Sequence, residues 1–285
     1  MAGPRVRRFS ERDIAFAIRL TNLERWGYTR ADFERLIALE PKGCFVAELG
    51  GKRVGLTCST VYGPLAFVGA VIVDPRVRGK GVGDALLRAT LDYLDGRGVE
   101  TVRLNAYLNV IPFYERLGFH GEYENGRYAG HLRSSGTAAP GVRVVREDEI
   151  TALADFDAPL FGAERAALLA HLAREFPQTF LVAKARGRFR GYIVGNPSDS
   201  GCEVGPWVVD PESADAASEL LHALVGIVRP EEIALSIPKA NPRESKLVDE
   251  LRLQEVFRTL RMYRGRRGFE GNPEAIFAMA GLEKG

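Results

Sequence analysis

Apolar and polar positions follow two different rhythms between residues 68 and 94. Residues 68–73 are all apolar or glycine, which is typical of a strand buried on both faces. Pro75 ends that strand, because a proline has no N–H to donate to a sheet. One helical face then carries four leucines, namely Leu86, Leu87, Leu91 and Leu94. The pattern therefore predicts a strand, a turn and a helix in direct succession.

The same pattern returns when the sequence is shifted by 136 residues against itself. The shift matches Val6-Arg7 to Val142-Arg143, Val46-Ala47 to Val182-Ala183, Val68-Gly69 to Val204-Gly205 and Val73-Asp74-Pro75 to Val209-Asp210-Pro211. One constant offset over this length predicts two copies of a single fold. We expect a first domain at residues 1–136 and a second at 141–285, joined by a small, polar linker at 134–141.

In each copy the pattern predicts a hairpin first and a strand–helix–strand unit after it. The expected strands cover residues 6–9, 44–49, 53–61, 68–73 and 102–106 in the first copy, and 142–146, 179–185, 189–195 and 233–237 in the second. Glycine-containing turns at 50–52 and 186–188 join the two strands of each hairpin. This order predicts the α/β class with α+β mixed sheets: two tandem domains, each a mixed, mostly antiparallel sheet flanked by helices.

Composition and charge indicate a globular protein and do not favour nucleic acid or a membrane as its partner. Of the 285 residues, 46% are hydrophobic and 27% charged, as in a globular protein with a full core. Because 39 basic and 37 acidic residues leave a net charge of +2, charge favours neither a nucleic-acid nor a membrane partner. No apolar run reaches membrane-spanning length, and no apolar signal segment follows the basic residues 4–8.

The cysteines and histidines indicate neither a disulfide framework nor a metal site. Cys44, Cys58 and Cys202 are odd in number and widely spaced, so we expect free thiols in a reducing cytoplasm. The four histidines show no metal-ligand spacing: His120, His131, His171 and His222. We therefore expect a cytoplasmic protein that uses no metal.

The turn after residue 75 has the chemistry of a phosphate site. Gly79, Gly81 and Gly83 allow positive φ angles and close approach of an anion, and Arg78 and Lys80 add positive charge. The following helix begins with N–H groups that lack partners inside the helix. An ordinary strand-to-helix turn is the alternative interpretation. The second copy has Glu212 to Ala217 in this region, with no glycine or cation, so we expect no phosphate there.

A second motif lies downstream at residues 109–119. Pro112 suits the start of a short helix, and Gly118 suits its end. Phe113 and Leu117 are four residues apart on one face, so they are expected to pack inward. Tyr114 lies beside this buried stripe, where packing is the simplest role for a tyrosine.

Together these motifs resemble the GNAT superfamily of acyl-CoA-dependent N-acyltransferases. Its R-x-x-G-x-G signature is met by Arg78, Gly81 and Gly83, and Tyr114 lies in a Y-E-x-L-G-F context. The whole chain is similar to tandem-GNAT proteins, whose second copy has a degenerate cofactor loop. Further similar positions are Trp26, Asp32, Arg127, residues 157–165 and residues 276–283.

The resemblance implies roles for particular residues. Acetyl-CoA is the expected co-substrate, with its pyrophosphate on the backbone amides of the loop and its pantetheine arm along a strand that splays from its neighbour. The implied cofactor-binding residues are Val71, Ile72, Val73, Arg78, Gly79, Lys80, Gly81, Val82, Gly83 and Asn109. Tyr114 would protonate the departing thiolate as general acid. Asn109 lies five residues before Tyr114, a shorter interval than is common in the family.

The base that accepts the amine proton is left open by the sequence. Many family members carry a glutamate on the central strand, but residues 66–73 contain no carboxylate. Glu24, Glu48 and Tyr62 are candidates, as is a chain of water molecules, while surface or packing roles are the simpler interpretation of each residue. The second copy either shapes the acceptor pocket or has a structural packing role.

The resemblance thus implies an N-acetyltransferase in which the amine of a small molecule attacks the thioester directly. A protein lysine or N-terminal acetyltransferase is the first alternative. A non-catalytic sensor that binds acyl-CoA is the second, and it comes from a different class. No nucleic acid or membrane is expected as partner, and a homodimer is compatible with the sequence.

Overall fold

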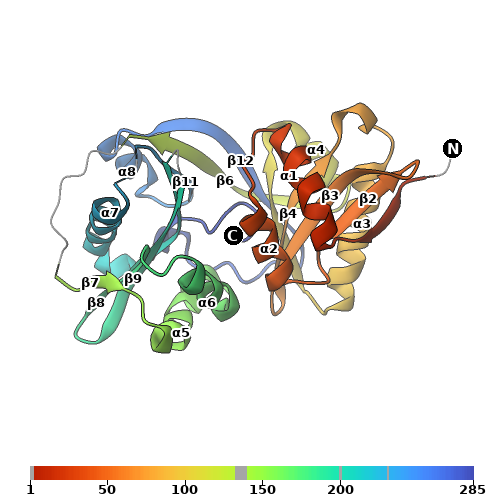
Figure 1. Ribbon diagram of the computed structural model, residues 1–285. Helices are drawn as coiled ribbons and strands as arrows, with labels where there is room; N and C mark the ends of the chain where they lie inside the picture. Colours follow the sequence, from red (N-terminus) through yellow and green to blue (C-terminus); the bar gives the residue numbers. More distant parts are fainter. Residues whose placement is uncertain (1–2, 132–139, 199–200, 230) are drawn as a thin grey trace. The chain divides into compact units, whose positions relative to one another are not determined.

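A computed structural model describes residues 3–131, 140–198, 201–229 and 231–285. The chain divides into two compact units, of which the first contains residues 1–104 with Lys284 and the second residues 105–283 with Gly285 (Figure 1). Most of the expected linker at 134–141 lies outside the described residues. None of the described helices is both long and apolar enough to cross a membrane.

The first unit contains a mixed sheet with the strand order β1-β2-β3-β4-β5. Its strands are β1 (Arg5–Arg8), β2 (Phe45–Leu49), β3 (Lys52–Tyr62), β4 (Leu65–Val73) and β5 (Thr101–Tyr107), whose last three residues count with the second unit. Successive strands from β1 to β4 are antiparallel, and β4 and β5 are parallel. The strands expected from hydrophobicity alone are all present.

Helices cover both faces of this sheet. They are η1 (Glu11–Asp13), α1 (Ile14–Asn22), α2 (Arg30–Leu39), η2 (Pro75–Val77) and α3 (Val82–Gly96). Neighbouring residues of β2 belong to different cores: Val46 packs in the cluster of α1 and α2, whereas Phe45 packs in that of α3. Because successive strand residues point to opposite faces, α1 and α2 lie on one face and α3 lies on the other.

The second unit has the strand order β12-β6-β11-β10-β9-β8-β7, and β13 pairs with β10 outside this order. Its strands are β6 (His120–Gly130), β7 (Val142–Val144), β8 (Phe180–Ala185), β9 (Arg188–Ser198), β10 (Gly201–Val209), β11 (Ile233–Pro238), β12 (Gln254–Gly265) and β13 (Ile276–Ala278). Among the described strand pairs of this unit, β10 and β11 are parallel and the others are antiparallel.

Strand β6 belongs to the first copy by sequence but lies between two strands of the second. It pairs antiparallel with β11 over Gly130 to Asn125 and with β12 over Ala129 to His120. The compact units therefore divide the chain after Leu104, not at the predicted seam near residue 136. That seam stays a prediction about where one sequence copy ends and the next begins.

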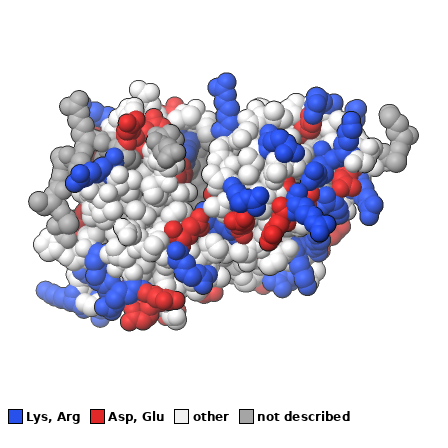
Figure 2. Space-filling view, viewed as in Figure 1, with Lys and Arg blue, Asp and Glu red and all other residues white. Residues whose placement is uncertain are grey.

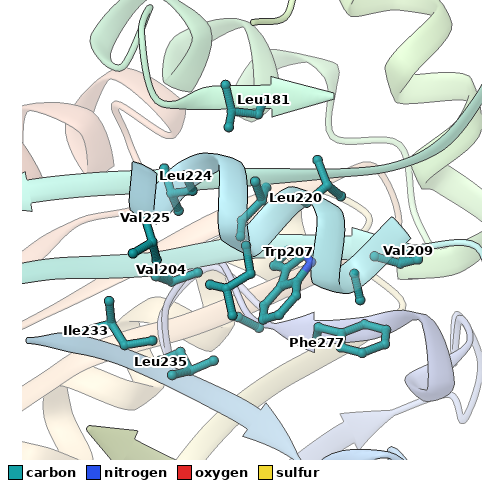
Figure 3. Close-up of a cluster of buried hydrophobic side chains, with 14 of the residues drawn as sticks. Leu181, Val204, Trp207, Val209, Leu220, Leu224, Val225, Ile233, Leu235 and Phe277 are labelled. Carbon is teal, nitrogen blue, oxygen red and sulfur yellow. The ribbon is translucent and has the colours of Figure 1, made fainter. Parts of the chain in front are cut away.

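A hydrophobic core fills the second unit around α7 (Asp215–Val228). Leu220 and Leu224 of α7 face Trp207 and Val204 of β10, and Phe277 of β13 joins the same cluster (Figure 3). The other helices are η3 (Leu108–Val110), α4 (Ile111–Glu115), η4 (Glu147–Glu149), α5 (Ile150–Phe161), α6 (Ala166–Glu175), η5 (Pro211–Ser213), α8 (Glu244–Glu250) and η6 (Pro273–Ala275).

The expected hairpin turns have the same backbone geometry in both copies. Gly50 and Gly51 have φ angles of 58° and 76°, and Arg186 and Gly187 have 49° and 80°. Two successive positive φ angles are typical of the type I′ turn, which matches the twist of paired strands. On the face that Figure 2 shows, basic and acidic side chains are interspersed, in keeping with the net charge of +2.

Candidate active site

The glycine loop connects the end of β4 to the start of α3. Asp74 ends the strand: its carboxylate accepts a hydrogen bond from the backbone N–H of Arg76 at 3.0 Å. The single turn η2 follows, and Gly81 then forms the N-cap of α3. Hydrogen bonds from Arg76 lower the pKa of Asp74, so this carboxylate stays ionised and keeps the turn closed.

The loop requires glycine for its conformation rather than for lack of space. Gly79 and Gly81 have φ angles of 78° and 76°, where side chains with a Cβ are disfavoured. A Cβ added at either position would meet no atom within 4 Å. The space above the loop is therefore open to a ligand.

The loop and the first turn of α3 contain five successive backbone N–H groups that make no hydrogen bond within the described part of the chain. No described residue accepts a hydrogen bond from the N–H groups of Gly79, Lys80, Gly81, Val82 and Gly83. They stand at the N-terminal end of a helix of 15 residues, where the helix dipole adds partial positive charge. Such a row of donors fits the pyrophosphate of coenzyme A.

Arg78 reaches back from the loop and fixes its base. Its Nε donates to the carbonyl oxygen of Val73 at 3.1 Å, and its guanidinium group pairs with Glu24. Lys80 is exposed and has no partner among the described residues. The loop therefore keeps one cation free for a phosphate and holds the other in an ion pair.

Strand β4 separates from β5 before it reaches the loop. The two strands pair only from Leu65 to Phe67. On its other side β4 has an irregularity in its ladder with β3, and within it Ala70 has a positive φ of 50°. The edge of β4 from residue 68 to 73 has no strand beside it on the β5 side within the first unit. The strand therefore splays from its neighbour, the geometry that the resemblance implied for a pantetheine site.

The predicted pantetheine residues contribute in different ways. Val71 and Val73 are half-buried, whereas the side chain of Ile72 is 3% exposed and packs in the core under α1 and α2. Ile72 can therefore contact a ligand only through its backbone. The predicted set from Val71 to Gly83 is brought together on one strand and the following loop.

Tyr114 lies in α4 of the second unit as a buried phenol. Its ring centroid is 5.1 Å from that of Phe113 and 6.0 Å from that of Phe119, and the residue is 7% exposed. Burial raises the pKa of Tyr114, and no described residue forms a hydrogen bond with its hydroxyl group. The phenol therefore stays protonated and free to donate.

Asn109 lies exposed in η3 of the second unit and has no hydrogen bond to a described residue. The loop belongs to the first unit, so the roles of Tyr114 and Asn109 toward a bound cofactor stay predictions.

The candidates for the general base have other partners. Glu48 accepts a hydrogen bond from Arg7 at 2.8 Å on the neighbouring strand β1. The hydroxyl of Tyr62 donates to the backbone oxygen of Lys284 at 2.9 Å, in a buried position. Glu24 pairs with Arg78 at the loop itself. Glu24 is thus paired with a predicted cofactor-binding residue.

The second copy has filled both parts of this site. Helix α7 begins at Asp215, which the 136-residue shift matches to Gly79, so the helix starts earlier and replaces the loop. Beside β10, the slot is occupied by β13, which pairs with Trp207 and Val208. The shift matches these two residues to Val71 and Ile72. The predicted loss of the second phosphate site thus has a structural counterpart.

Sequence reasoning missed β13, although two signals were present. Pro206, inside an otherwise strand-like run, indicates an irregular strand and matches Ala70 of the first copy. Residues 276–280 form a short apolar run near the end of the chain.

Among the described residues, no group of three or more His, Cys, Asp or Glu side chains could hold a metal ion.

Comparison with known proteins gives the same assignment for both copies. The model of the acetyltransferase (GNAT) family matches residues 14–119, and that of an acetyltransferase (GNAT) domain matches residues 153–278. A holothin acyltransferase from a Pseudoalteromonas strain is 26% identical over 92% of this chain and 88% of its own length. A mycothiol acetyltransferase from Thermobispora bispora is 39% identical, but over only 28% of this chain and 30% of its own.

Solved structures extend the likeness to the whole fold. A candidate acetyltransferase from Pyrococcus horikoshii has a TM-score of 0.85 and 23% identity, covering 100% of this chain and 97% of its own. A tandem GNAT protein from the clavulanic acid biosynthesis pathway has a TM-score of 0.64 and 14% identity, covering 92% and 98%. With two matching domains, a glycine loop on a splayed strand and a second, filled copy, this chain is a tandem member of the GNAT acetyltransferase family.

Proposed function

We propose that the protein is an acyl-CoA-dependent N-acyltransferase that transfers acetyl from acetyl-CoA to the primary amine of a small molecule. The observation that carries the proposal is the row of unpartnered N–H groups from Gly79 to Gly83 beside the splayed edge of β4. The row of N–H groups is suited to a pyrophosphate, and the edge of β4 is suited to a chain that carries amides. Coenzyme A carries both groups in that order.

The residues of the first unit would hold and position the co-substrate. The backbone of Gly79 to Gly83 would bind the pyrophosphate with help from Lys80, and the free edge of Val71 to Val73 would bind the pantetheine amides. When bound, acetyl-CoA supplies an acyl group activated as a thioester. The protein's contribution is then mostly orientation of that thioester toward the amine.

The reaction needs one group that donates a proton to the leaving thiolate and one that accepts a proton from the amine. The phenol of Tyr114 would donate its proton to the thiolate sulfur as the carbon–sulfur bond breaks, because burial keeps it protonated. The amine loses one proton as its bond to the acyl carbon forms. Glu24, which pairs with Arg78 of the loop, or water would accept that proton; Glu48 and Tyr62 are bonded to residues outside the proposed site.

A small-molecule acceptor is favoured by the relatives. Two of them take their names from holothin and mycothiol rather than from a protein acceptor. A family member covering 92% of this chain is among them. We therefore assign the acceptor to small amines and leave the choice among them to experiment.

The test is thiol release from acetyl-CoA with a panel of small amines and lysine peptides. We expect turnover with a small amine, and a fall in kcat of about 10²-fold for Tyr114→Phe with little change in the KM for acetyl-CoA. Tyr263→Phe is the matched control, because its hydroxyl also has no partner among the described residues.

Each other outcome selects an alternative. Turnover with lysine peptides only would support a protein acetyltransferase. Binding of acetyl-CoA without turnover of any amine would support an acyl-CoA sensor. A Tyr114→Phe variant with unchanged kcat would remove Tyr114 from the mechanism.

A further inference from the structure

The second copy contains a binding slot that is filled by the protein's own C-terminal segment. In the second unit, β10 pairs with β11 only at Cys202 and Glu203, and its ladder with β9 is irregular between Val204 and Trp207. Both features match β4 of the first copy, where pairing with β5 also ends early beside an irregular stretch. The splayed edge has therefore been kept in both copies.

Strand β13 enters this splayed edge as an extended peptide. It pairs antiparallel with Trp207 and Val208 of β10, and the N–H of Met279 donates to the carbonyl oxygen of Ser236 in β11 at 2.9 Å. The segment thus bonds to both of the strands that separate. Pantetheine is likewise a linear chain with amides, so the two ligands present similar groups to the same edge.

Side chains of the second unit are shaped around this segment. The ring centroids of Trp207 and Phe277 lie 5.2 Å apart in the core, as Figure 3 shows. The amide of Asn241 donates to the carbonyl oxygen of Ile276 at 3.0 Å. A Cβ at Gly205 would overlap the carbonyl oxygen of Met279, so the strand can approach only a glycine there.

The residues on either side of β13 are also held. The N–H of Asn272 donates to Leu160 at 2.7 Å, and a Cβ at Gly162 would overlap the carbonyl oxygen of Phe269. Beyond β13, Asn105 donates to Leu282 at 2.6 Å. These contacts join the end of α5 to residues 269–272, directly before β13, and hold the chain again at Leu282, beyond it.

We propose that the degenerate copy is a peptide-binding module derived from a cofactor slot, with the chain's own residues 272–283 as its ligand. The slot recognises an extended strand through main-chain hydrogen bonds and accepts an aromatic side chain against Trp207. The second copy therefore binds a peptide in the place where the first is suited to pantetheine. This holds whether or not the first copy acetylates an amine.

The test cuts the folded chain and asks whether the segment stays bound. A recognition sequence for a site-specific protease is inserted between Arg266 and Arg267, which are both exposed, and the protein is cut after folding. We expect the fragment beginning at residue 267 to co-elute with the rest of the chain in size-exclusion chromatography at micromolar concentration. Phe277→Ala should weaken its retention at least tenfold, whereas Glu274→Gln, at an exposed position of the same segment, should not.

Two results would overturn the proposal. One is release of the wild-type fragment at micromolar concentration. The other is a Phe277→Ala fragment retained as strongly as the wild type, which would show that the slot beside Trp207 is not what binds it.

Discussion

Arg7 holds Asp13 through two hydrogen bonds of 2.8 and 2.9 Å, and the pair joins β1 to the start of the first helical segment. The 136-residue shift matches this pair to Arg143 and Glu149, whose two hydrogen bonds are both 2.7 Å long. The same clamp therefore closes the entry of both copies, with aspartate in one and glutamate in the other.

These clamps predict a loss of stability in acid. Burial raises the pKa of Asp13, but hydrogen bonds from Arg7 and neighbouring groups outweigh it and hold that pKa well below its usual range. Hydrogen bonds from Arg143 lower the pKa of Glu149 in the same way. Because both pKa values are depressed on folding, the stabilisation is complete above the unfolded values near 4 and is lost as the pH falls below them.

Asp13→Asn tests this by thermal unfolding at several pH values. At neutral pH we expect a loss of about 1.5–3 kcal/mol, the usual size for a hydrogen bond to a charged group. The difference from wild type should shrink as the pH falls below about 4. Asp92→Asn, at an exposed position of α3, is the control. A difference that stays constant with pH would contradict the assignment.

The loop predicts that a negative charge at Gly81 weakens acetyl-CoA binding, and a neutral variant of similar shape separates this effect from a loss of stability. Gly81→Asp and Gly81→Asn have similar shape, and both residues tolerate a positive φ angle better than most. The aspartate adds a negative charge to the proposed phosphate site, so it should weaken acetyl-CoA binding at least tenfold more than asparagine does. Equal affinities for the two variants, measured by calorimetry at matched stability, would remove the phosphate from this loop.

A buried ion pair predicts a strong dependence of the second unit on one aspartate. Asp157 and Arg165 are fully buried and joined by hydrogen bonds of 2.6 and 2.9 Å, and Tyr192 donates to the same carboxylate at 2.6 Å. Asp157→Asn removes the carboxylate that bonds this buried arginine twice, so we expect a loss of about 3–5 kcal/mol in urea unfolding.

Two further variants give this prediction its controls. Asp155→Asn, exposed on the same helix α5, should change stability by less than about 0.5 kcal/mol. Adding Arg165→Gln to Asp157→Asn should recover part of the loss, because both charges of the buried pair are then removed. A double variant less stable than the single one would mean that packing, and not charge, controls this site.

The buried cysteines predict that the native protein does not react with thiol reagents. Cys44, Cys58 and Cys202 are buried free thiols, and burial raises the pKa of Cys202 to about 12. Since the thiolate is the reactive form, none should react in the native protein within minutes, and all three should react in denaturant. Rapid labelling of a native thiol would contradict the burial and would also compromise a thiol-release assay.

Local patterns predicted the strand, turn and helix that carry the candidate loop, and long-range pairing accounts for what they missed. The apolar run at 68–73, Pro75 and the glycines follow from the needs of neighbouring residues, so they could be interpreted from sequence alone. The insertion of β6 between β11 and β12 depends on contacts between segments over 100 residues apart. Hydrophobic periodicity contains no information on which strands pair across such a distance. The pairing of β13 with β10 at Trp207 could not be predicted for the same reason.

Calorimetry can count the acetyl-CoA molecules that the chain binds, and this number tests whether only the first copy holds the co-substrate. The first copy has the open loop and the free edge of β4, whereas α7 and β13 fill the corresponding places in the second. We predict one site for each chain, lost or strongly weakened in Gly81→Asp. Two sites for each chain, or one site unaffected by Gly81→Asp, would contradict it.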